Sequence, residues 1–198
     1  MGKMSKYSWI VMVIAGFALL TGCAQESQKA APAEVVATAS ATDSSIIFKP
    51  GYYEDKNLGF SFTYPAVVFS VEVDKKIHEV VAREGAQRIP ACTVRVLDMP
   101  AGYTLENIPE WIKKDLKKMY PASKRHKIIE TNMIKLENGI DANYALLKWR
   151  YQGSIALLTA YISVFKDGKL ITSNSTSVPG QPPVEQLTEW AKALKVTQ

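Results

Sequence analysis

Residues 155–165, IALLTAYISVF, decide the fold. Over this stretch the apolar side chains alternate between two faces of a β-strand, with Leu157 and Tyr161 on one face and Leu158 and Ile162 on the other. A strand that is apolar on both faces has to be covered on both. The sequence therefore predicts a central strand inside a layered domain.

This strand lies within a series of predicted hairpins. Asn138-Gly139, Gln152-Gly153 and Asp167-Gly168 separate apolar runs, and Asn-Gly and Asp-Gly pairs tolerate the positive φ angles of tight hairpin turns. We expect four consecutive antiparallel strands at residues 128–136, 140–151, 155–165 and 169–177. Alternating strand patterns precede them at residues 60–64 and 67–74, and weaker ones lie at residues 78–84 and 92–97.

Two segments show helical periodicity instead. Thr104–Met119 carries apolar residues at helical spacing behind a threonine cap, and Val184–Val196 does so behind Pro182-Pro183. These helices are the available cover for the sheet. The expected fold is α+β in class, an antiparallel β-sheet (meander) covered by helices.

Composition and charge restrict the class of protein. With 47% apolar and 22% charged residues, the chain is neither a disordered tail nor a polytopic membrane protein. The 24 Lys and Arg residues exceed the 19 Asp and Glu residues by only five. This excess is too small and too dispersed for a surface that binds duplex nucleic acid, so no nucleic-acid partner is expected.

The first residues have the pattern of an export signal. Lys3 and Lys6 precede an uncharged apolar run at residues 9–20, WIVMVIAGFALL, which reaches about 18 Å as a helix and cannot cross a hydrocarbon core of about 30 Å. Leu20-Thr21-Gly22-Cys23 then resembles the lipobox of bacterial lipoproteins. The alternative is an ordinary secretory signal that happens to contain a cysteine.

The lipobox resemblance implies an organisation for the whole chain. Cleavage between Gly22 and Cys23 would leave residues 1–22 as the signal peptide, residues 23–50 as a lipidated Cys23 with a flexible tether, and residues 51–198 as the domain. Covalent acyl chains on Cys23 would be the only bound group, with no other cofactor. Ala24 in place of Asp implies the outer membrane, facing the periplasm, if the cell is Gram-negative.

The domain also resembles a known family. Tyr53-Glu54-Asp55, the aromatic strand Gly59–Pro65 and the helix opening Thr104-Leu105-Glu106 occur in the order typical of the PsbP-like group, which includes DcrB-like bacterial lipoproteins. The resemblance implies a PsbP-like α/β sandwich. It also implies a non-enzymatic accessory or binding domain of an envelope complex, and it supplies no catalytic residue.

Sites for chemistry are scarce in the sequence. His78 and His126 are the only histidines, so a histidine-rich metal site is excluded, and no nucleotide-binding or nucleophile-elbow motif occurs. Cys92 alternates onto the same face as two valines and is predicted to be a buried small apolar residue. We therefore expect no enzyme, no catalytic residue and no metal.

Two surfaces remain as candidates for binding. The lysine face, defined as Lys113, Lys114, Lys117 and Lys118 with Trp111 beside them, opposes the apolar stripe of its predicted helix. It is either an ordinary solvated face or a contact for an acidic envelope partner or anionic headgroups. The alternative function is a small-ligand carrier or sensor, with a pocket between sheet and helix lined by Tyr144, Trp149 and Tyr161.

Overall fold

The computed structural model describes residues 45–66, 69–84 and 91–197. The expected signal peptide (residues 1–22), the lipidation site Cys23 and the tether up to residue 44 lie outside the described residues. Among the helices described, none has the length and apolar character needed to span a bilayer.

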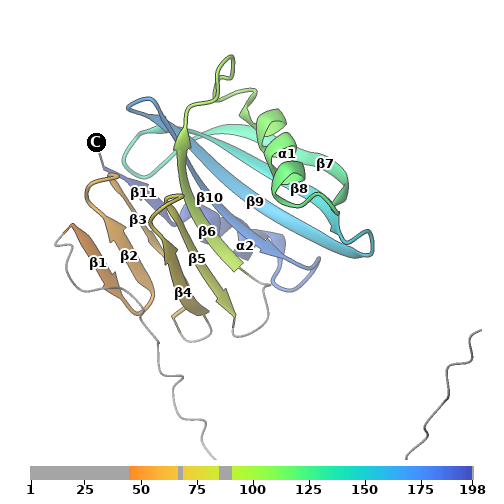
Figure 1. The fold of residues 1–198 in the computed structure, drawn as a ribbon, viewed down its shortest axis with the longest axis horizontal. Helices are drawn as coiled ribbons and strands as arrows, with labels where there is room; N and C mark the ends of the chain where they lie inside the picture. The colour runs from red at the N-terminus through yellow and green to blue at the C-terminus, as the bar shows by residue number, and fades with distance from the viewer. Residues whose placement is uncertain (1–44, 67–68, 85–90, 198) are drawn as a thin grey trace, which may run out of the picture. The chain divides into compact units, whose positions relative to one another are not determined.

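Two antiparallel sheets form the domain (Figure 1). The larger has seven strands in the order β4-β5-β6-β10-β9-β8-β7, and the smaller has four in the order β1-β2-β3-β11. The strands of the larger sheet are β4 (Phe69–Asp74), β5 (Glu79–Glu84), β6 (Ala91–Asp98), β7 (Lys124–Lys135), β8 (Asp141–Tyr151), β9 (Ile155–Lys166) and β10 (Lys169–Ser177). Those of the smaller sheet are β1 (Ile46–Lys49), β2 (Tyr52–Asp55), β3 (Phe60–Thr63) and β11 (Leu194–Val196).

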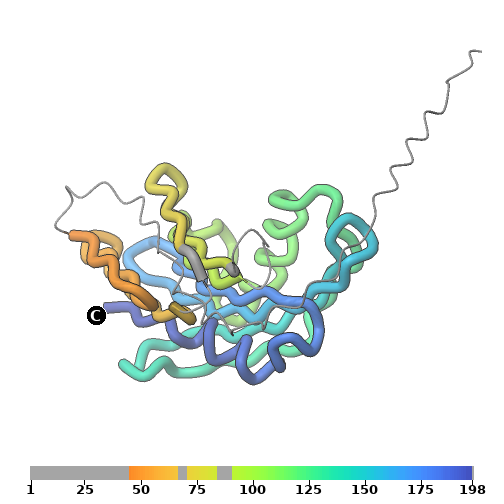
Figure 2. Tube along the Cα trace, turned by 90° about the horizontal axis from the view of Figure 1, so that it is seen from below, coloured from red at the N-terminus to blue at the C-terminus, as the bar shows by residue number. Residues whose placement is uncertain are grey.

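The two helices lie on opposite faces of the larger sheet, as Figure 2 shows. Helix α1 (Ile108–Met119) packs Ile112 and Leu116 against one face, in a core that it shares with Leu147 and Leu157. Helix α2 (Val184–Lys192) packs Leu187 and Ala191 against the other face. Strand β9 is therefore buried on both sides, as its alternating apolar pattern requires.

The predicted cover of the sheet was wrong. We expected an α+β domain in which helices cover the sheet, whereas the described fold consists mostly of antiparallel β-structure with two short helices. On the face that carries α2, most of the cover comes from the smaller sheet, whose Tyr53, Phe60 and Phe62 join the same core as Val94 and Ile162. A second sheet can bury these aromatic residues because successive side chains alternate, so one face of each short strand is apolar.

Both helix boundaries also differ from the prediction. Helix α1 begins at Ile108 with a proline in its first turn, and its N-cap residue is Asn107, so Thr104 lies before the helix and does not cap it. Helix α2 ends at Lys192, and Leu194–Val196 becomes β11, which pairs with Phe60–Phe62 of β3. The first strand, β1, begins at Ile46, inside the stretch expected to be the end of the tether.

Helix α1 leaves part of its face of the sheet uncovered. Its most extensive strand contacts are with β7 and β8, at one edge of the seven-stranded sheet. Strands β5, β6 and β10 lie beyond the helix on the same face, and their side chains there are largely polar or charged. The end of α1 and these three strands enclose the site described next.

Candidate functional site

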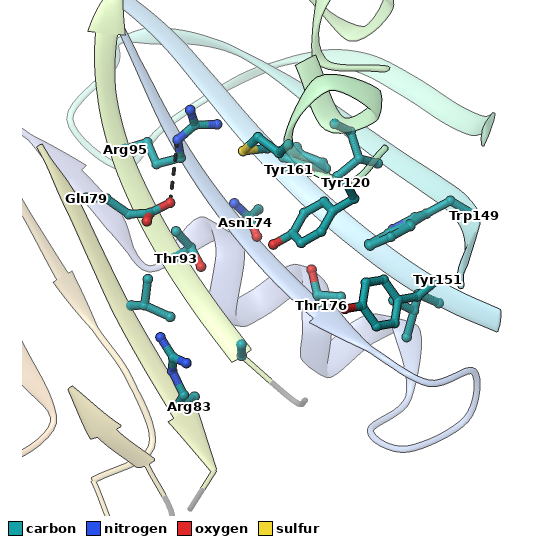
Figure 3. Close-up of a pocket in the computed structure, with 15 residues that line it drawn as sticks. Glu79, Arg83, Thr93, Arg95, Tyr120, Trp149, Tyr151, Tyr161, Asn174 and Thr176 are labelled. Carbon is teal, nitrogen blue, oxygen red and sulfur yellow. Dashed lines mark ion pairs between the residues drawn. The ribbon is translucent and has the colours of Figure 1, made fainter. Parts of the chain in front are cut away.

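A cavity of about 240 Å³ lies between the C-terminal end of α1 and the uncovered strands (Figure 3). Leu116, Met119 and Tyr120 border it from the helix side, and Trp149, Tyr151, Leu157 and Tyr161 border it from β8 and β9. Strands β5, β6 and β10 supply the rest of the lining: Glu79, Val81, Arg83, Ala91, Thr93, Arg95, Asn174 and Thr176. The cavity thus has three parts. Its aromatic wall is formed by Tyr120, Trp149, Tyr151 and Tyr161, its polar floor by Thr93, Asn174 and Thr176, and its charged side by Glu79, Arg83 and Arg95.

The aromatic wall is held rigidly by contacts among its rings. The Trp149 ring is only 4% exposed and lies between Tyr120, at 5.4 Å between ring centroids, and His126, at 6.2 Å. Its indole Nε1 donates a hydrogen bond of 2.9 Å to Oγ1 of Thr159, which satisfies the buried polar group. Tyr120, which is 41% exposed, is the most accessible ring of this wall.

Ion pairs organise the charged side. Arg95 lies with Nη1 2.8 Å from Oδ2 of Asp115 on α1 and with Nε 3.5 Å from Oε1 of Glu79 on β5. Arg83 pairs with Glu72 of β4 at 2.7 Å. Burial raises the pKa of Glu79 above its usual range, while Arg95 opposes that shift. The cavity therefore contains two guanidinium groups and one partly desolvated carboxyl group.

Several polar groups around the cavity lack a hydrogen-bond partner within the described part of the chain. They are the hydroxyl of Tyr161, the hydroxyl of Tyr120 and the side-chain amide of Asn174. Tyr161 is only 5% exposed, and burial raises the pKa of its hydroxyl well above the usual range. Figure 3 shows the Tyr120 hydroxyl directed toward Asn174 across the floor. These hydroxyl and amide groups can therefore donate to or accept from a molecule that enters the cavity.

The predicted pocket residues separate into two groups. Trp149 and Tyr161 line the cavity, but Tyr144 lies on the opposite face of the sheet. There its hydroxyl lies 3.2 Å from Oγ1 of Thr188, and Nζ of Lys192 lies 5.9 Å from the centre of its ring. Sequence reasoning missed Arg95 and Asn174, although the alternation of β6 already placed Arg95 opposite the valines.

The lysine face lies on α1 but does not enter the cavity. Lys113 pairs with Glu110 at 2.6 Å, and Nζ of Lys114 donates to the Tyr103 hydroxyl at 2.8 Å. Lys117 and Lys118 are exposed in the last turn of the helix and form no ion pair with any residue that the structure describes. Trp111 is half-buried against the core beneath α1, so it contributes mainly packing.

Cys92 is buried and unreactive in the folded domain. It is 1% exposed, and burial raises the pKa of its thiol to about 12. The Ser175 hydroxyl donates to its sulfur at 3.4 Å. Over the described ranges no group of three or more His, Cys, Asp and Glu side chains is placed to hold a metal ion.

Comparisons with known proteins identify the fold. No protein-family model matches the chain, and no characterised protein matches it by sequence. The solution structure of cyanobacterial PsbP (CyanoP) from Synechocystis sp. PCC 6803 superposes with a TM-score of 0.56 at 17% identity, over 80% of this chain and 96% of that chain. The domain therefore has a PsbP-like fold.

More distant structural matches are a Pseudomonas aeruginosa protein of unknown function, PA94, and a Bacteroides thetaiotaomicron protein. The first has a TM-score of 0.42 at 10% identity, over 64% of this chain and 82% of that chain. The second has a TM-score of 0.44 at 14% identity, over 78% of this chain and 48% of that chain.

Proposed function

We propose that this chain is a non-enzymatic binding protein, held at a bacterial envelope membrane by acyl chains on Cys23, and that its ligand occupies the cavity beside α1. The observation that carries the proposal is the cavity itself, whose lining brings together an aromatic wall with the Tyr120 and Tyr161 hydroxyls and the Asn174 amide, groups that hydrogen-bond to no other residue that the structure describes. A concave site with an aromatic wall and a few convergent polar groups is typical of small-molecule binding.

Other features support a binding role. A PsbP-like fold is consistent with an accessory or binding protein, and the resemblance brings no catalytic residue with it. The lipobox Leu20-Thr21-Gly22-Cys23 and the apolar run before it support the membrane tether. A tethered carrier or sensor needs no reactive group, only a site that a ligand can enter and leave.

A thermal-shift screen of the full-length chain in detergent tests this function. A ligand that binds only the folded state raises the melting temperature, by an amount that grows with its concentration over the Kd. We expect at least one compound of a diverse small-molecule library to do so. If no compound raises the transition, the proposed function is wrong.

Two matched variants locate the binding. Thr93→Phe places a ring on the cavity floor, whereas Thr63→Phe makes the same change at an exposed position of strand β3. We expect the hits to be lost in Thr93→Phe and kept in Thr63→Phe. Hits that survive equally in both variants would show that the ligand binds elsewhere.

A second function is favoured by a separate observation. Lys117 and Lys118 are exposed and lack ion-pair partners within the described residues, which suits docking on an acidic surface of an envelope complex. In that case the domain is an accessory subunit, and the lysine face is its contact surface.

A further inference from the structure

We propose that basic side chains at one end of β7 and β8 form a docking surface for a membrane that contains anionic phospholipids. The centre of this surface is the strand quartet, defined as Lys124 and Lys127 of β7 with Lys148 and Arg150 of β8. None of these four residues lines the cavity beside α1, so the inference concerns a separate site. It rests on the proposed membrane tether only for the choice of a bilayer as the partner.

The strand quartet consists of two pairs of like charges that face each other across neighbouring strands. Lys124 is the register partner of Arg150, and Lys127 is the register partner of Lys148. The Cβ atoms of directly opposed residues lie about 4.5–5.5 Å apart, and like charges in such pairs lower stability. None of the four side chains forms an ion pair with a residue that the structure describes. The fold therefore holds four positive charges together at a cost in stability.

A β-bulge brings both lysines of the quartet to the same face. Lys124 and Lys127 are three residues apart, so they would point to opposite faces of a regular strand. The register shift between them adds one residue, so that they oppose two residues of β8 that are only two apart. Arg125, inside this bulge, has a φ of 58°, a left-handed conformation that is uncommon outside glycine. Bulges at sheet edges commonly re-aim side chains in this way beside functional sites.

The strand quartet lies on the face of the larger sheet that carries α2, at an end that the helix leaves open. Leu147 and Trp149 alternate with Lys148 and Arg150 along β8 and pack in the core beneath α1, so the two basic residues point the other way. Helix α2 makes its most extensive strand contacts with β9 and β10. Three members of the quartet are exposed, and Arg150 is half-buried. The quartet is thus an open surface and is accessible to a broad partner.

Protection of the sheet edge does not explain the whole quartet. β7 is an edge strand, and exposed lysines and bulges on such strands oppose pairing with another chain. This protection accounts for Lys124 and Lys127. β8 lies between β7 and β9, however, so Lys148 and Arg150 protect no edge. An arrangement that lowers stability without a local structural reason is typical of a functional surface.

The acidic residues of the two strands do not neutralise this charge. β7 and β8 contain two of them, Glu130 and Asp141. Glu130 accepts a hydrogen bond of 2.7 Å from the side-chain amide of Asn132. Asp141 lies at the other end of β8 and pairs with Lys135 at 2.6 Å. An anionic partner is therefore the complement of the quartet end of these strands.

The surroundings of the quartet favour a bilayer as that partner. Burial and the charge of nearby Lys117 lower the pKa of the His126 imidazole, so Lys117 extends the positive charge around the edge of the sheet. Two exposed isoleucines border the quartet: Ile129, 47% exposed, in the second bulge of β7, and Ile155, 43% exposed, at the hairpin end of β9. Surfaces that lie on anionic membranes combine basic residues with exposed apolar side chains.

Energy transfer in reconstituted vesicles tests this surface on the full-length chain. A donor dye is attached at Ser154→Cys, in the β8–β9 hairpin beyond Arg150, and lipid headgroups carry the acceptor. The vesicles consist of phosphatidylcholine alone or of phosphatidylcholine with phosphatidylglycerol. We expect more energy transfer on the vesicles that contain phosphatidylglycerol. The difference should fall as salt is added, because salt screens exposed charges.

Charge variants locate the docking. Lys148→Gln, Arg150→Gln should weaken docking on the anionic vesicles about thirtyfold, since each basic residue near such a surface contributes about fivefold. Lys148→Arg, Arg150→Lys keeps the charges and should keep the docking. Lys75→Gln, Lys76→Gln makes the same charge change in the exposed β4–β5 turn and should have no effect. Lys148→Gln alone, at an exposed position, should weaken docking about fivefold and stays informative if the double variant does not fold.

The outcomes separate the docking surface from the proposed function. Equal energy transfer on the two kinds of vesicle, or full docking in both quartet variants that lose charge, would overturn the docking surface. Loss of a cross-linked protein from the double variant, with vesicle docking intact, would also overturn it and assign the quartet to an acidic protein. Flotation with phosphatidylcholine vesicles reports the acyl chains on Cys23, and the thermal-shift screen reports the cavity, so both parts of the proposed function are tested independently.

Discussion

Arg95 of β6 and Asp115 of α1 form an ion pair, with 2.8 Å between Nη1 and Oδ2. This contact joins the helix to a strand beyond β7 and β8, the two strands with which α1 makes its most extensive contacts. Both side chains are largely buried, at 16% and 19% exposure. The pair therefore fixes the distance between the end of α1 and the floor of the cavity.

We predict that Asp115→Asn lowers the free energy of unfolding by about 1–3 kcal/mol, because it leaves the Arg95 guanidinium partly buried with a weaker partner. Urea denaturation of the full-length chain measures the change. Lys135→Gln is the control, since Lys135 and Asp141 form an ion pair that is mostly exposed to solvent. An equal change in the free energy of unfolding for the two variants would show that the Arg95–Asp115 pair stabilises the fold no more than an exposed ion pair does.

The double variant Lys117→Gln, Lys118→Gln tests docking through the lysine face. If each exposed lysine contributes about 1 kcal/mol to contact with an acidic partner, the affinity should fall about thirtyfold. Recovery of the partner after cross-linking in intact cells measures this, while the melting temperature should not change. Lys75→Gln, Lys76→Gln in the exposed β4–β5 turn is the matched control. Unchanged recovery would exclude this face as the contact.

The hairpin strands could be predicted because their turns are encoded locally. Gln152 and Gly153 both have positive φ, as do Asp167 and Gly168. Asp167-Gly168 closes a two-residue hairpin between Lys166 and Lys169, and Gln152-Gly153 lies in the three-residue loop between Tyr151 and Ile155. Glycine at the second position of each pair removes the steric cost of a left-handed backbone. The sequence between these turns alternates, so the register of β8, β9 and β10 follows from neighbouring residues alone.

The smaller sheet could not be predicted, because it depends on a distant pairing. β11 has only three residues, and it pairs Leu194–Val196 with Phe60–Phe62 at the other end of the domain. Within Val184–Val196, the apolar spacing fits a continued helix as well as it fits a strand. No local pattern distinguishes the two, so tertiary contact decides.

The candidate site was predictable only in part, for a related reason. Trp149 and Tyr161 do line a pocket between sheet and helix, but Tyr144 lies five residues before Trp149 and so points to the other face. Residues an odd number of positions apart on a strand point to opposite faces, so this spacing could have separated Tyr144 from Trp149 in the sequence. Helix α1 does not extend over β5, β6 and β10. This results from tertiary packing, and no local sequence pattern predicts it.

His126 should make stability depend on pH. Burial and the nearby Lys117 and Lys113 lower the pKa of its imidazole, which stacks on Trp149 and lies 2.9 Å from the Ser123 hydroxyl. The unfolded chain therefore takes up a proton first as pH falls from about 6.5. We predict that the free energy of unfolding decreases as pH falls from 7 to 5, and that His126→Asn weakens this dependence. His78→Asn, in the exposed β4–β5 turn, is the control for loss of an imidazole.

Urea titrations at a series of pH values between 5 and 7 give this dependence. An identical slope in the parent chain and in His126→Asn would show that His126 does not carry the effect.

Cys23→Ser tests the proposed membrane tether. The sulfur of Cys23 is the only attachment point that the lipobox resemblance provides, so its loss should move the chain from the membrane fraction to the soluble fraction. Mass spectrometry of the parent chain should show a diacylated or triacylated cysteine at its N-terminus. Retention of Cys23→Ser on membranes after a high-salt wash would contradict a lipid anchor.

The location of a bound ligand tests the central claim most directly. We would determine the crystal structure of the chain in complex with a hit from the thermal-shift screen. The account predicts electron density for the ligand between the Tyr120 ring and the Asn174 amide, in contact with the Tyr161 hydroxyl. Ligand density confined to any other surface, with none in the cavity beside α1, would contradict it.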